Sequence, residues 1–244
     1  MTTGSQSQID VSVVIPCLNE ERGIVECIHK IKAAFQKESC SYEIVVSDNG
    51  STDRTVELAS QSGARVVHQP IRGYGAAYLK GFTEARGRWI IMGDGDDTYD
   101  FSQLGPFLRE LENGSELVMG SRFKGTILPG AMPWLHLYVG NPILSGILNW
   151  LFGVSISDSH CGLRALTKDA FQRMNLVTTG MEFASEMVIK ASFANLRITE
   201  VPITYHPRLG DSKLRSFRDG WRHLRFMLLY SPGPLFLAPG VVAS

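Results

Sequence analysis

The sequence lacks a net charge, and it lacks the features that mark exported or membrane-spanning chains. Its 244 residues carry 24 Lys and Arg against 24 Asp and Glu, so the formal net charge is zero. This balance argues against a dedicated nucleic-acid-binding protein, because such proteins usually show a basic excess. The opening segment, MTTGSQSQID, has neither the basic nor the apolar region of a signal peptide. No window of about 20 residues is cleanly apolar, as a membrane-spanning helix would require.

Cysteine is scarce and irregularly spaced. The four cysteines are Cys17, Cys27, Cys40 and Cys161, and they form neither a CxxC pair nor a zinc-ligand spacing. A chain of this length buries a sufficient core without disulfides. We therefore expect free thiols in a reducing, cytoplasmic compartment.

Linkers, low-complexity stretches and internal repeats are also missing, which favours a single domain. We expect this domain over residues 11–230, after a disordered start at residues 1–10. Residues 231–244 form an uncharged, Pro-containing apolar tail, at which the chain could enter a membrane.

What the first half does contain is an alternation of short apolar runs and helical patterns. Strands are expected at residues 11–16, 42–47, 64–68 and 88–92, and helices at 20–37, 53–62 and 75–85. This alternation predicts an α/β fold with a mostly parallel sheet and helices on both faces. Ligands of such sheets bind outside the carboxyl ends of the strands. The second half is less regular, with strands expected at 116–120 and 196–205 and helices at 133–152, 182–194 and 214–230.

Acidic residues gather after the fourth expected strand. Asp94-Gly95-Asp96 is followed by Asp97 and Asp100, and neighbouring carboxylates repel one another unless a cation or solvent compensates them. Mg²⁺ and Mn²⁺ prefer carboxylate oxygens, and one or two Asp residues suffice when substrate phosphates supply further ligands. Asp94 and Asp96 are therefore candidate metal ligands, with a solvated acidic turn as the alternative.

Polar residues also follow the neighbouring strands. Asp48 ends the second strand, from which it could project into the cleft and accept hydrogen bonds from a nucleobase or ribose. Glu20 follows the first strand and could do likewise. The segment Arg72-Gly73-Tyr74-Gly75 opens the next helix, where glycines suit either a bound phosphate or a close backbone approach.

Taken together, these motifs resemble family 2 glycosyltransferases, which have the GT-A fold. The resemblance rests on VSVVIPCLNEE, VVSDNGSTDRT, RGYGAA and IIMGDGDD. The later segments GSRF, DSHCGLRAL, GMEFASE and EVPITYHPRLGDSKL are similar to the polyprenyl-phosphate branch, which includes dolichol-phosphate mannose and glucose synthases. The resemblance extends over residues 11–230, in order and at family-like spacing.

The resemblance implies roles for individual residues. The nucleotide sugar would be bound by Pro16, Leu18, Glu20, Asp48, Asp94 and Gly95. Asp94 and Asp96 would bind the Mg²⁺ or Mn²⁺ that holds the donor diphosphate. The phosphates of donor or acceptor would be contacted by Arg122, Arg208, Ser212 and Lys213. Catalysis would depend on Asp96, Arg122, Arg208 and Lys213.

The sequence departs from the family at three places. The usual Asp-Asp-Gly-Ser is Asp48-Asn49-Gly50-Ser51 here, and Thr98 stands where relatives often carry a Gln after the metal pair. No Arg occurs between residues 123 and 163, where mannose synthases typically place one, and His136 or Lys124 could substitute for it. The missing Arg favours a UDP-sugar donor over GDP-mannose.

The residue inventory fits transfer to a phosphate group. An acceptor phosphate monoester carries most of two negative charges at neutral pH, so it is already a nucleophile and needs no Ser-His-Asp or Cys-His arrangement. We expect a single in-line displacement that inverts the anomeric centre, with a metal and basic side chains stabilising the leaving nucleoside diphosphate.

Other residues leave alternatives open. Glu182 and Glu186 lie one helical turn apart and are either sugar contacts in the cleft or an ordinary exposed face. Asp158, His160 and Cys161 belong to the DSHCG motif, which turn formation and packing explain about as well as a functional role.

Membrane contact is expected because a polyprenyl tail stays in the bilayer. Basic residues between 208 and 225 lead into the uncharged tail, and the expected helix at 133–152 carries aromatic residues suited to a lipid interface. The expected partners are a nucleotide sugar, a polyprenyl phosphate and the cytoplasmic membrane surface, with a separate or missing transmembrane part. Two alternatives are a transferase with another acceptor (a glycolipid, a polysaccharide or a small phosphorylated molecule) and a non-catalytic nucleotide-sugar-binding protein.

Overall fold

A computed structural model describes residues 9–209, 216–231 and 233. Its seven strands are β1 (Val11–Cys17), β2 (Tyr42–Asp48), β3 (Arg65–His68), β4 (Trp89–Met92), β5 (Leu117–Ile127), β6 (Arg164–Thr167) and β7 (Ile198–Tyr205). The α-helices are α1 (Ile24–Phe35), α2 (Thr55–Gln61), α3 (Tyr74–Glu84), α4 (Gly105–Glu112), α5 (Asn141–Phe152), α6 (Lys168–Met174), α7 (Phe183–Phe193) and α8 (Ser216–Tyr230). Two short helices complete the described part, η1 (Phe101–Gln103, 3₁₀) and η2 (His136–Gly140, a π-helical turn).

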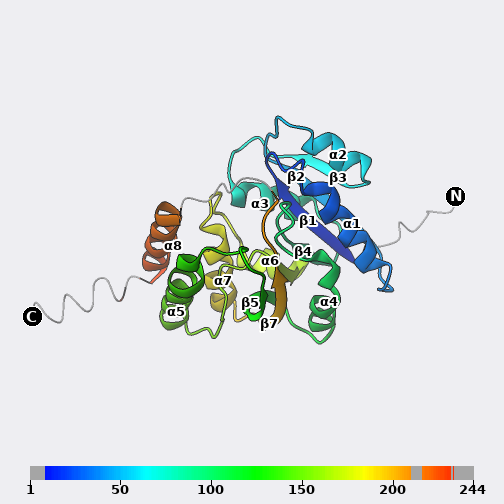
Figure 1. Ribbon diagram of the computed structural model, residues 1–244. Helices are drawn as coiled ribbons and strands as arrows, with labels where there is room; N and C mark the ends of the chain where they lie inside the picture. The colour runs from blue at the N-terminus through cyan, green and yellow to red at the C-terminus, as the bar shows by residue number, and fades with distance from the viewer. Residues whose placement is uncertain (1–8, 210–215, 232, 234–244) are drawn as a thin grey trace, which may run out of the picture.

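All seven strands form one sheet in the order β3-β2-β1-β4-β6-β5-β7 (Figure 1). β6 runs antiparallel to β4 and β5, whereas the remaining neighbours pair in parallel. The expected α/β class with a mostly parallel sheet is thus confirmed. In the first half, the expected strand ends agree with the structure to within one residue.

Side chains of the strands alternate between two buried cores, one on each face of the sheet. On β1, Val13 and Ile15 pack with α1, α2 and α4, whereas Val14 packs with α3 and α7 on the other face. Because both faces are covered, the strands are continuous apolar runs rather than alternating ones. No disulfide joins the four cysteines, all of which lie within the described residues.

Three elements of the second half were not expected from the sequence. Helix α4 begins with Gly105 and Pro106, which are typical of loops in sequence, although Pro is compatible with a first helical turn. Strand β6 has only four residues and begins with a charged one, Arg164, so it carries no strand pattern. Helix α6 follows β6 directly and has seven residues.

The continuous helix expected at residues 133–152 is wrong in one respect. The chain forms the π-helical turn η2 first, in which the Asn141 N–H donates to the carbonyl of His136, and α5 begins only at Asn141. Pro142 has no N–H to give to the carbonyl four residues earlier, so a regular helix cannot run through this point. Helix α5 contacts both η2 and α8, and α5 and α8 lie at one end of the molecule (Figure 1).

Glu186 on α7 has a structural role that the sequence did not indicate. Its carboxylate is fully buried and accepts hydrogen bonds from the N–H groups of Val177 and Thr178, the Thr178 hydroxyl and the Lys190 ammonium. Both sequence-based alternatives for Glu186, a sugar contact or an exposed face, are therefore wrong. Burial alone would raise the pKa of Glu186, but Lys190 and the Thr178 and Val177 donors hold it below its usual value.

Replacing Glu186 by Gln should lower the free energy of unfolding in urea at neutral pH by about 1–3 kcal/mol, because buried N–H donors lose a charged acceptor. The pKa of Glu186 is lower in the folded than in the unfolded chain, so its stabilisation is complete above about pH 4.3 and disappears as the pH falls through the folded value. The difference between wild type and Glu186→Gln should therefore shrink on acidification. Glu112 is exposed, and the Glu112→Gln variant serves as a control. A difference in unfolding free energy between wild type and Glu186→Gln that does not change with pH would contradict the role of the Glu186 carboxylate as a charged acceptor.

Candidate functional site

One cavity of about 980 Å³ opens at the carboxyl ends of the strands, where the α/β architecture predicts a ligand. It brings together eight of the site residues expected from the sequence, and these are Pro16, Leu18, Glu20, Asp94, Gly95, Asp96, Arg122 and Arg208. Ser212 and Lys213, also expected to contact phosphate, lie outside the described residues. Residues separated by almost 200 positions, such as Glu20 and Arg208, thus meet at one site.

Asp94 is held by two tyrosines from α3. Its Oδ1 accepts hydrogen bonds from the Tyr74 and Tyr78 hydroxyls, both at 3.0 Å, and no described residue donates to its Oδ2. Burial raises the pKa of Asp94, and the negative charge of Asp96 raises it further, against the two tyrosine hydrogen bonds. The sequence contained both tyrosines at helical spacing, but nothing in it indicated that they face Asp94.

Asp96 is bound from two sides. Its Oδ1 accepts from the Thr98 N–H at 3.1 Å and from the Thr98 hydroxyl at 2.6 Å, and its Oδ2 lies 3.0 Å from the Arg208 guanidinium. Arg208 also donates to Glu20 at 2.9 Å, so one cation links the ends of β1, β4 and β7. Thr98 therefore orients Asp96.

The two carboxylates fit a divalent cation. Both line the cavity, and the repulsion between them is what a bound cation would relieve. No cluster of three or more His, Cys, Asp or Glu side chains suited to a metal occurs in the described part of the chain. Two carboxylates suit Mg²⁺ or Mn²⁺, because these ions are commonly bound by one or two carboxylates together with substrate phosphates. A site in which the protein supplies every ligand would need more donors.

Asp48 is placed differently from the other expected residues. Its side chain is 4% exposed and does not line the cavity; it accepts hydrogen bonds from the Gly50 and Ser51 N–H groups and lies 3.3 Å from His68 Nδ1. Burial opposes its ionisation, but these hydrogen bonds keep the pKa of Asp48 below its usual value. In this structure Asp48 shapes the turn after β2, and the neighbouring Asn49 lines the cavity instead.

The glycines at the start of α3 allow the backbone of the segment at Thr178 and Thr179 to approach this helix closely. A Cβ at Gly73 would lie 2.1 Å from the Thr179 carbonyl oxygen, and one at Gly75 would lie 2.3 Å from that of Thr178. The N–H groups of Gly75 and Ala76 donate to backbone carbonyls of this same segment, those of Gly180 and Thr179. Because these N–H groups already have acceptors within the protein, the glycines are better explained by the close approach of the two backbones than by a phosphate bound at this end of the helix.

Arg122 forms a buried pair with Asp158 of the DSHCG motif. Asp158 is completely buried and accepts from Arg122 Nε and Nη2, both at 2.7 Å, and from the Arg122 N–H at 3.1 Å. Burial alone would lower the pKa of Arg122, but the Asp158 carboxylate raises it, so the guanidinium stays charged. Tyr205 adds a cation–π contact at 5.2 Å. Asp158 thus orients one expected phosphate ligand, a role left open by the sequence.

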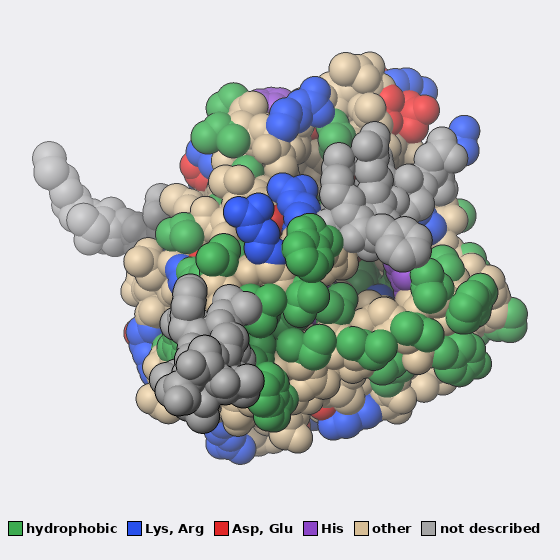
Figure 2. Space-filling model, turned by 90° about the vertical axis from the view of Figure 1, so that its left-hand side faces the viewer, with side chains coloured by type: hydrophobic (Ala, Val, Ile, Leu, Met, Phe, Trp, Pro, Cys, Tyr) green, Lys and Arg blue, Asp and Glu red, His purple; other side chains and the backbone are tan. Residues whose placement is uncertain are grey.

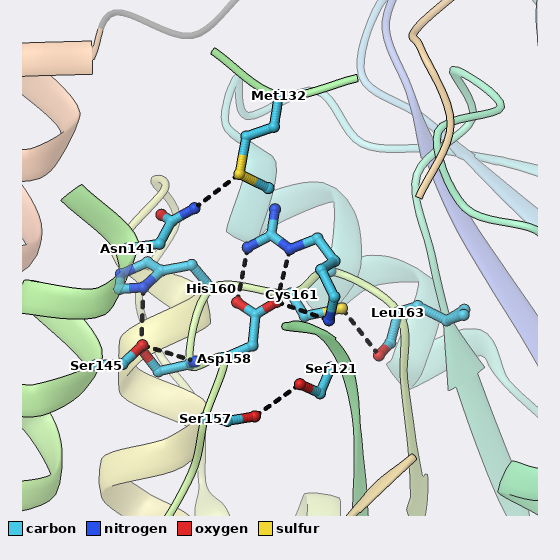
Figure 3. A network of polar contacts seen from close by, with 12 residues as sticks. Ser121, Met132, Asn141, Ser145, Ser157, Asp158, His160, Cys161 and Leu163 are labelled. Atoms are coloured by element: carbon cyan, nitrogen blue, oxygen red, sulfur yellow. Dashed lines mark hydrogen bonds and ion pairs between the residues drawn. The ribbon is translucent and has the colours of Figure 1, made fainter. Parts of the chain in front are cut away.

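The rest of the DSHCG motif joins several helices at the base of the cavity. His160 Nδ1 lies 2.9 Å from the Ser159 hydroxyl, which lies 2.9 Å from the hydroxyl of Ser145 on α5. Figure 3 shows Ser145 and His160 in this network, with Asp158 beside them. His160 also makes an edge-to-face contact with His223 of α8, which in turn bonds to Ser185 of α7.

Arg164 supports the loop beside the cavity, a role that the sequence analysis did not predict. It is fully buried and donates from Nε to Cys161, from Nη1 to Ala184 and from Nη2 to Ser159, in each case to a backbone carbonyl at 2.8–2.9 Å. Burial lowers the pKa of Arg164. The guanidinium fixes the DSHCG loop against α7, and no sequence pattern distinguishes such an Arg from an exposed one.

The cavity has a second, apolar part beyond this polar floor. Its walls come from η2, α5 and the preceding loop on one side and from α8 on the other, and they include Met132, Leu135, Ile143, Leu144, Ile147, Trp221 and Leu224. Of the two possible substitutes for the missing Arg, His136 lines the cavity, whereas Lys124 pairs with Glu200 at 2.6 Å and does not line it.

Comparison with known sequences identifies the family. The model for "Glycosyl transferase family 2" matches residues 12–174. The low-salt glycan biosynthesis hexosyltransferase of Haloferax volcanii is 52% identical over 231 residues, covering 94% of this chain and 56% of that protein. The chain thus spans little more than half the length of this relative. The dolichyl-phosphate hexose transferase of the same organism is 32% identical, covering 86% of this chain and 89% of that protein.

Comparison with solved structures supports the fold. Glucosyl-3-phosphoglycerate synthase from Mycobacterium tuberculosis, solved with Mn²⁺, UDP-glucose and phosphoglyceric acid, aligns with a TM-score of 0.71 at 22% identity. The alignment covers 92% of this chain and 80% of that one. The family model and the 52% identical relative show that the chain belongs to glycosyl transferase family 2, and its structure has the GT-A fold that its motifs predict.

Proposed function

We propose that this glycosyltransferase transfers a hexose from a nucleotide sugar to a polyprenyl phosphate at the cytoplasmic face of a membrane. One observation carries the proposal: a single cavity joins a polar floor of Asp94, Asp96, Arg122 and Arg208 to an apolar part between α5 and α8. The polar floor matches the phosphates of donor and acceptor, and the apolar part matches an isoprenoid chain. The names of two relatives, a dolichyl-phosphate hexose transferase and a dolichol-phosphate mannosyltransferase of Pyrococcus furiosus, support the same acceptor.

The donor would lie across the ends of β1, β2 and β4. Pro16, Leu18 and Glu20 border the nucleotide end, and Asp94 and Asp96 would hold a divalent cation beside the diphosphate. When bound, this cation would neutralise charge on the departing diphosphate. A UDP-sugar fits the absence of the mannose-type Arg better than GDP-mannose does.

The acceptor phosphate would lie near Arg122 and Arg208. Asp158 holds the Arg122 side chain in one orientation, so little conformational entropy is lost when its guanidinium meets an anion. Arg208 already bonds to two carboxylates and can exchange one of them for a phosphate oxygen. Attack of a phosphate oxygen on the anomeric carbon forms one C–O bond, and the bond to the nucleoside diphosphate breaks with its electron pair leaving on that group.

The face that carries the apolar part of the cavity supports membrane docking. Exposed apolar side chains of η2, α5, α8 and the loop before η2 include Trp134, Tyr138, Ile143, Trp150, Trp221 and Leu229. Figure 2 shows hydrophobic side chains gathered around a hollow on this side, with Lys and Arg side chains beside it. Arg222 and Arg225 are exposed on α8 and suit anionic lipid headgroups. Within the described part of the chain, no helix is long and apolar enough to cross a bilayer.

The proposal is tested by incubating the protein with membranes and labelled UDP-glucose, UDP-galactose or GDP-mannose, with and without EDTA. We expect chloroform-soluble, mild-acid-labile label with at least one UDP-sugar, lost on chelation of the metal. Label transferred only to a water-soluble phosphorylated acceptor, such as 3-phosphoglycerate, would replace the lipid proposal. Donor hydrolysis without any transfer would contradict both, and absence of both hydrolysis and transfer would favour a non-catalytic binding protein.

Replacing Asp96 by Asn should lower the transfer rate by about 10²–10³-fold, because the amide is a poor ligand for a hard cation and no longer compensates Arg208. The rate is measured with the best donor over a range of Mn²⁺ concentrations. The matched control is Asp169→Asn, an exposed carboxylate on α6 outside the cavity, which should leave the rate unchanged. Full activity of Asp96→Asn at low Mn²⁺ would remove Asp96 from the metal site.

Replacing both Trp134 and Trp150 by Ala should weaken binding to vesicles of phosphatidylcholine and phosphatidylglycerol by about tenfold, because two large exposed apolar side chains no longer insert at the interface. Cosedimentation measures the bound fraction, and circular dichroism checks that the fold is retained. Val177→Ala, an exposed apolar residue outside η2, α5 and α8, is the control and should bind as the wild type does. Equal binding of the double variant would place the membrane contact elsewhere.

A further inference from the structure

The DSHCG loop (residues 158–162) holds two polar side chains that border the cavity. At its start, the Asp158 carboxylate accepts from Arg122 Nε and Nη2, both at 2.7 Å. At its end, the Gly162 N–H donates to the hydroxyl of Tyr99 at 2.7 Å. Arg122 and Tyr99 both line the cavity, so one loop fixes a cationic and a neutral hydrogen-bond donor at its wall.

Tyr205 of β7 supports both of these side chains. The centroid of its ring lies 5.3 Å from that of the Tyr99 ring and 5.2 Å from the guanidinium carbon of Arg122. The backbones of Tyr99 and Tyr205 also form an antiparallel β-bridge. Tyr99 is 3% exposed, so it is held at its ring by Tyr205 and at its hydroxyl by Gly162.

The hydroxyl hydrogen of Tyr99 has no acceptor among the residues that the structure describes. A phenol can accept one hydrogen bond and donate another, and the Gly162 N–H uses only the accepting side. Burial raises the pKa of Tyr99 well above its usual value, so the hydroxyl keeps its hydrogen at neutral pH. A buried donor without an acceptor is unfavourable, and an acceptor bound in the cavity would remove this cost.

The space beside this hydroxyl also borders the candidate metal site. A Cβ at Gly162 would lie 3.0 Å from Tyr99 Oη and 3.0 Å from Asp94 Oδ2, so the two oxygens flank one point at which glycine places no side chain. The charges of Asp94 and Arg122 both act on the Tyr99 hydroxyl. Tyr99 is therefore close to a candidate metal ligand and to a candidate phosphate ligand at the same time.

A phosphate group matches these surroundings. Ionised phosphate oxygens accept hydrogen bonds and cannot donate them, and they bind best where a cation and further donors converge. Arg122 supplies the cation and Tyr99 supplies a neutral O–H beside it. The phosphate of an acceptor has to reach the anomeric carbon next to the metal-bound diphosphate, which brings it close to Asp94.

We propose that the Tyr99 hydroxyl donates a hydrogen bond to the phosphate of the acceptor beside Arg122, with the Gly162 N–H directing the hydroxyl. This inference rests on the proposed polyprenyl phosphate acceptor and assigns a further contact to it. Tyr99 then sets affinity for the acceptor phosphate, and it affects neither the binding of the nucleotide nor that of the isoprenoid chain.

The test measures equilibrium binding by calorimetry to protein saturated with UDP and Mn²⁺, with farnesyl phosphate, inorganic phosphate and farnesol as probes. Tyr99→Phe keeps the ring and its contact with Tyr205 and removes the hydroxyl. This variant should bind farnesyl phosphate and inorganic phosphate about tenfold more weakly, because one hydrogen bond to a charged group is lost. Farnesol, which has no phosphate, should bind the variant as it binds the wild type, and so should UDP with Mn²⁺.

The matched control is Tyr42→Phe, which removes the same hydroxyl from a tyrosine that stacks on Phe35 outside the cavity. This control should leave all four affinities unchanged. Retained binding of UDP with Mn²⁺ and an unchanged circular dichroism spectrum show that Tyr99→Phe is folded.

Three results would overturn the contact between Tyr99 and the acceptor phosphate. The first is unchanged phosphate binding by Tyr99→Phe. The second is an equal loss of farnesol binding, which would mean that Tyr99 only supports the DSHCG loop. The third is a loss of UDP binding, which would place the contact on the donor diphosphate. If the wild type bound no farnesyl phosphate, the proposed acceptor class itself would fail, and this outcome differs from a wild type that binds while Tyr99→Phe binds equally well.

Discussion

Repulsion between two carboxylates at the end of β4 is the constraint on which the rest of the cavity depends. Burial and the neighbouring charge of Asp96 disfavour the ionised form of Asp94, and the chain provides separate partners for the two carboxylates. Two tyrosine hydroxyls from α3 bond to Asp94, while Thr98 and Arg208 bond to Asp96. A divalent cation held by both carboxylates would relieve the remaining repulsion between them. The two carboxylates therefore favour the binding of a cation at this point of the cavity.

A second set of buried charges connects this polar floor to the helices around the apolar part of the cavity. Asp158 fixes Arg122, and Arg164 binds three backbone carbonyls in the adjoining loop and in α7. Breaking such a buried pair leaves an uncompensated charge, so these side chains have few alternative positions. Through the Ser145–Ser159 and His160–His223 contacts, the DSHCG loop also links this polar floor to α5 and α8.

The sequence predicted the first half of the fold well; in the second half it predicted β5, β7, α7 and α8 but missed α4, β6 and α6, for identifiable reasons. The β-branched runs of β1, β2 and β4 are buried on both faces, so hydrophobicity alone located them. Strand β6 was missed because it is short and begins with Arg164, whose burial depends on carbonyl partners distant from any strand pattern. Glu186 was misjudged for the same reason, since its donors lie in a separate loop.

The order of residues along the chain determined the family, the GT-A fold and most of the candidate site, because motifs at strand ends meet wherever parallel strands lie side by side. The pairing of side chains was decided only in the folded chain. The Asp48 carboxylate bonds within its own loop, and Asn49 lines the cavity where Asp48 was expected. Arg208 forms ion pairs with Glu20 and Asp96. Which side chains pair depends on distances of a few ångströms between elements that are far apart in the sequence. The spacing of residues along the chain does not determine such distances.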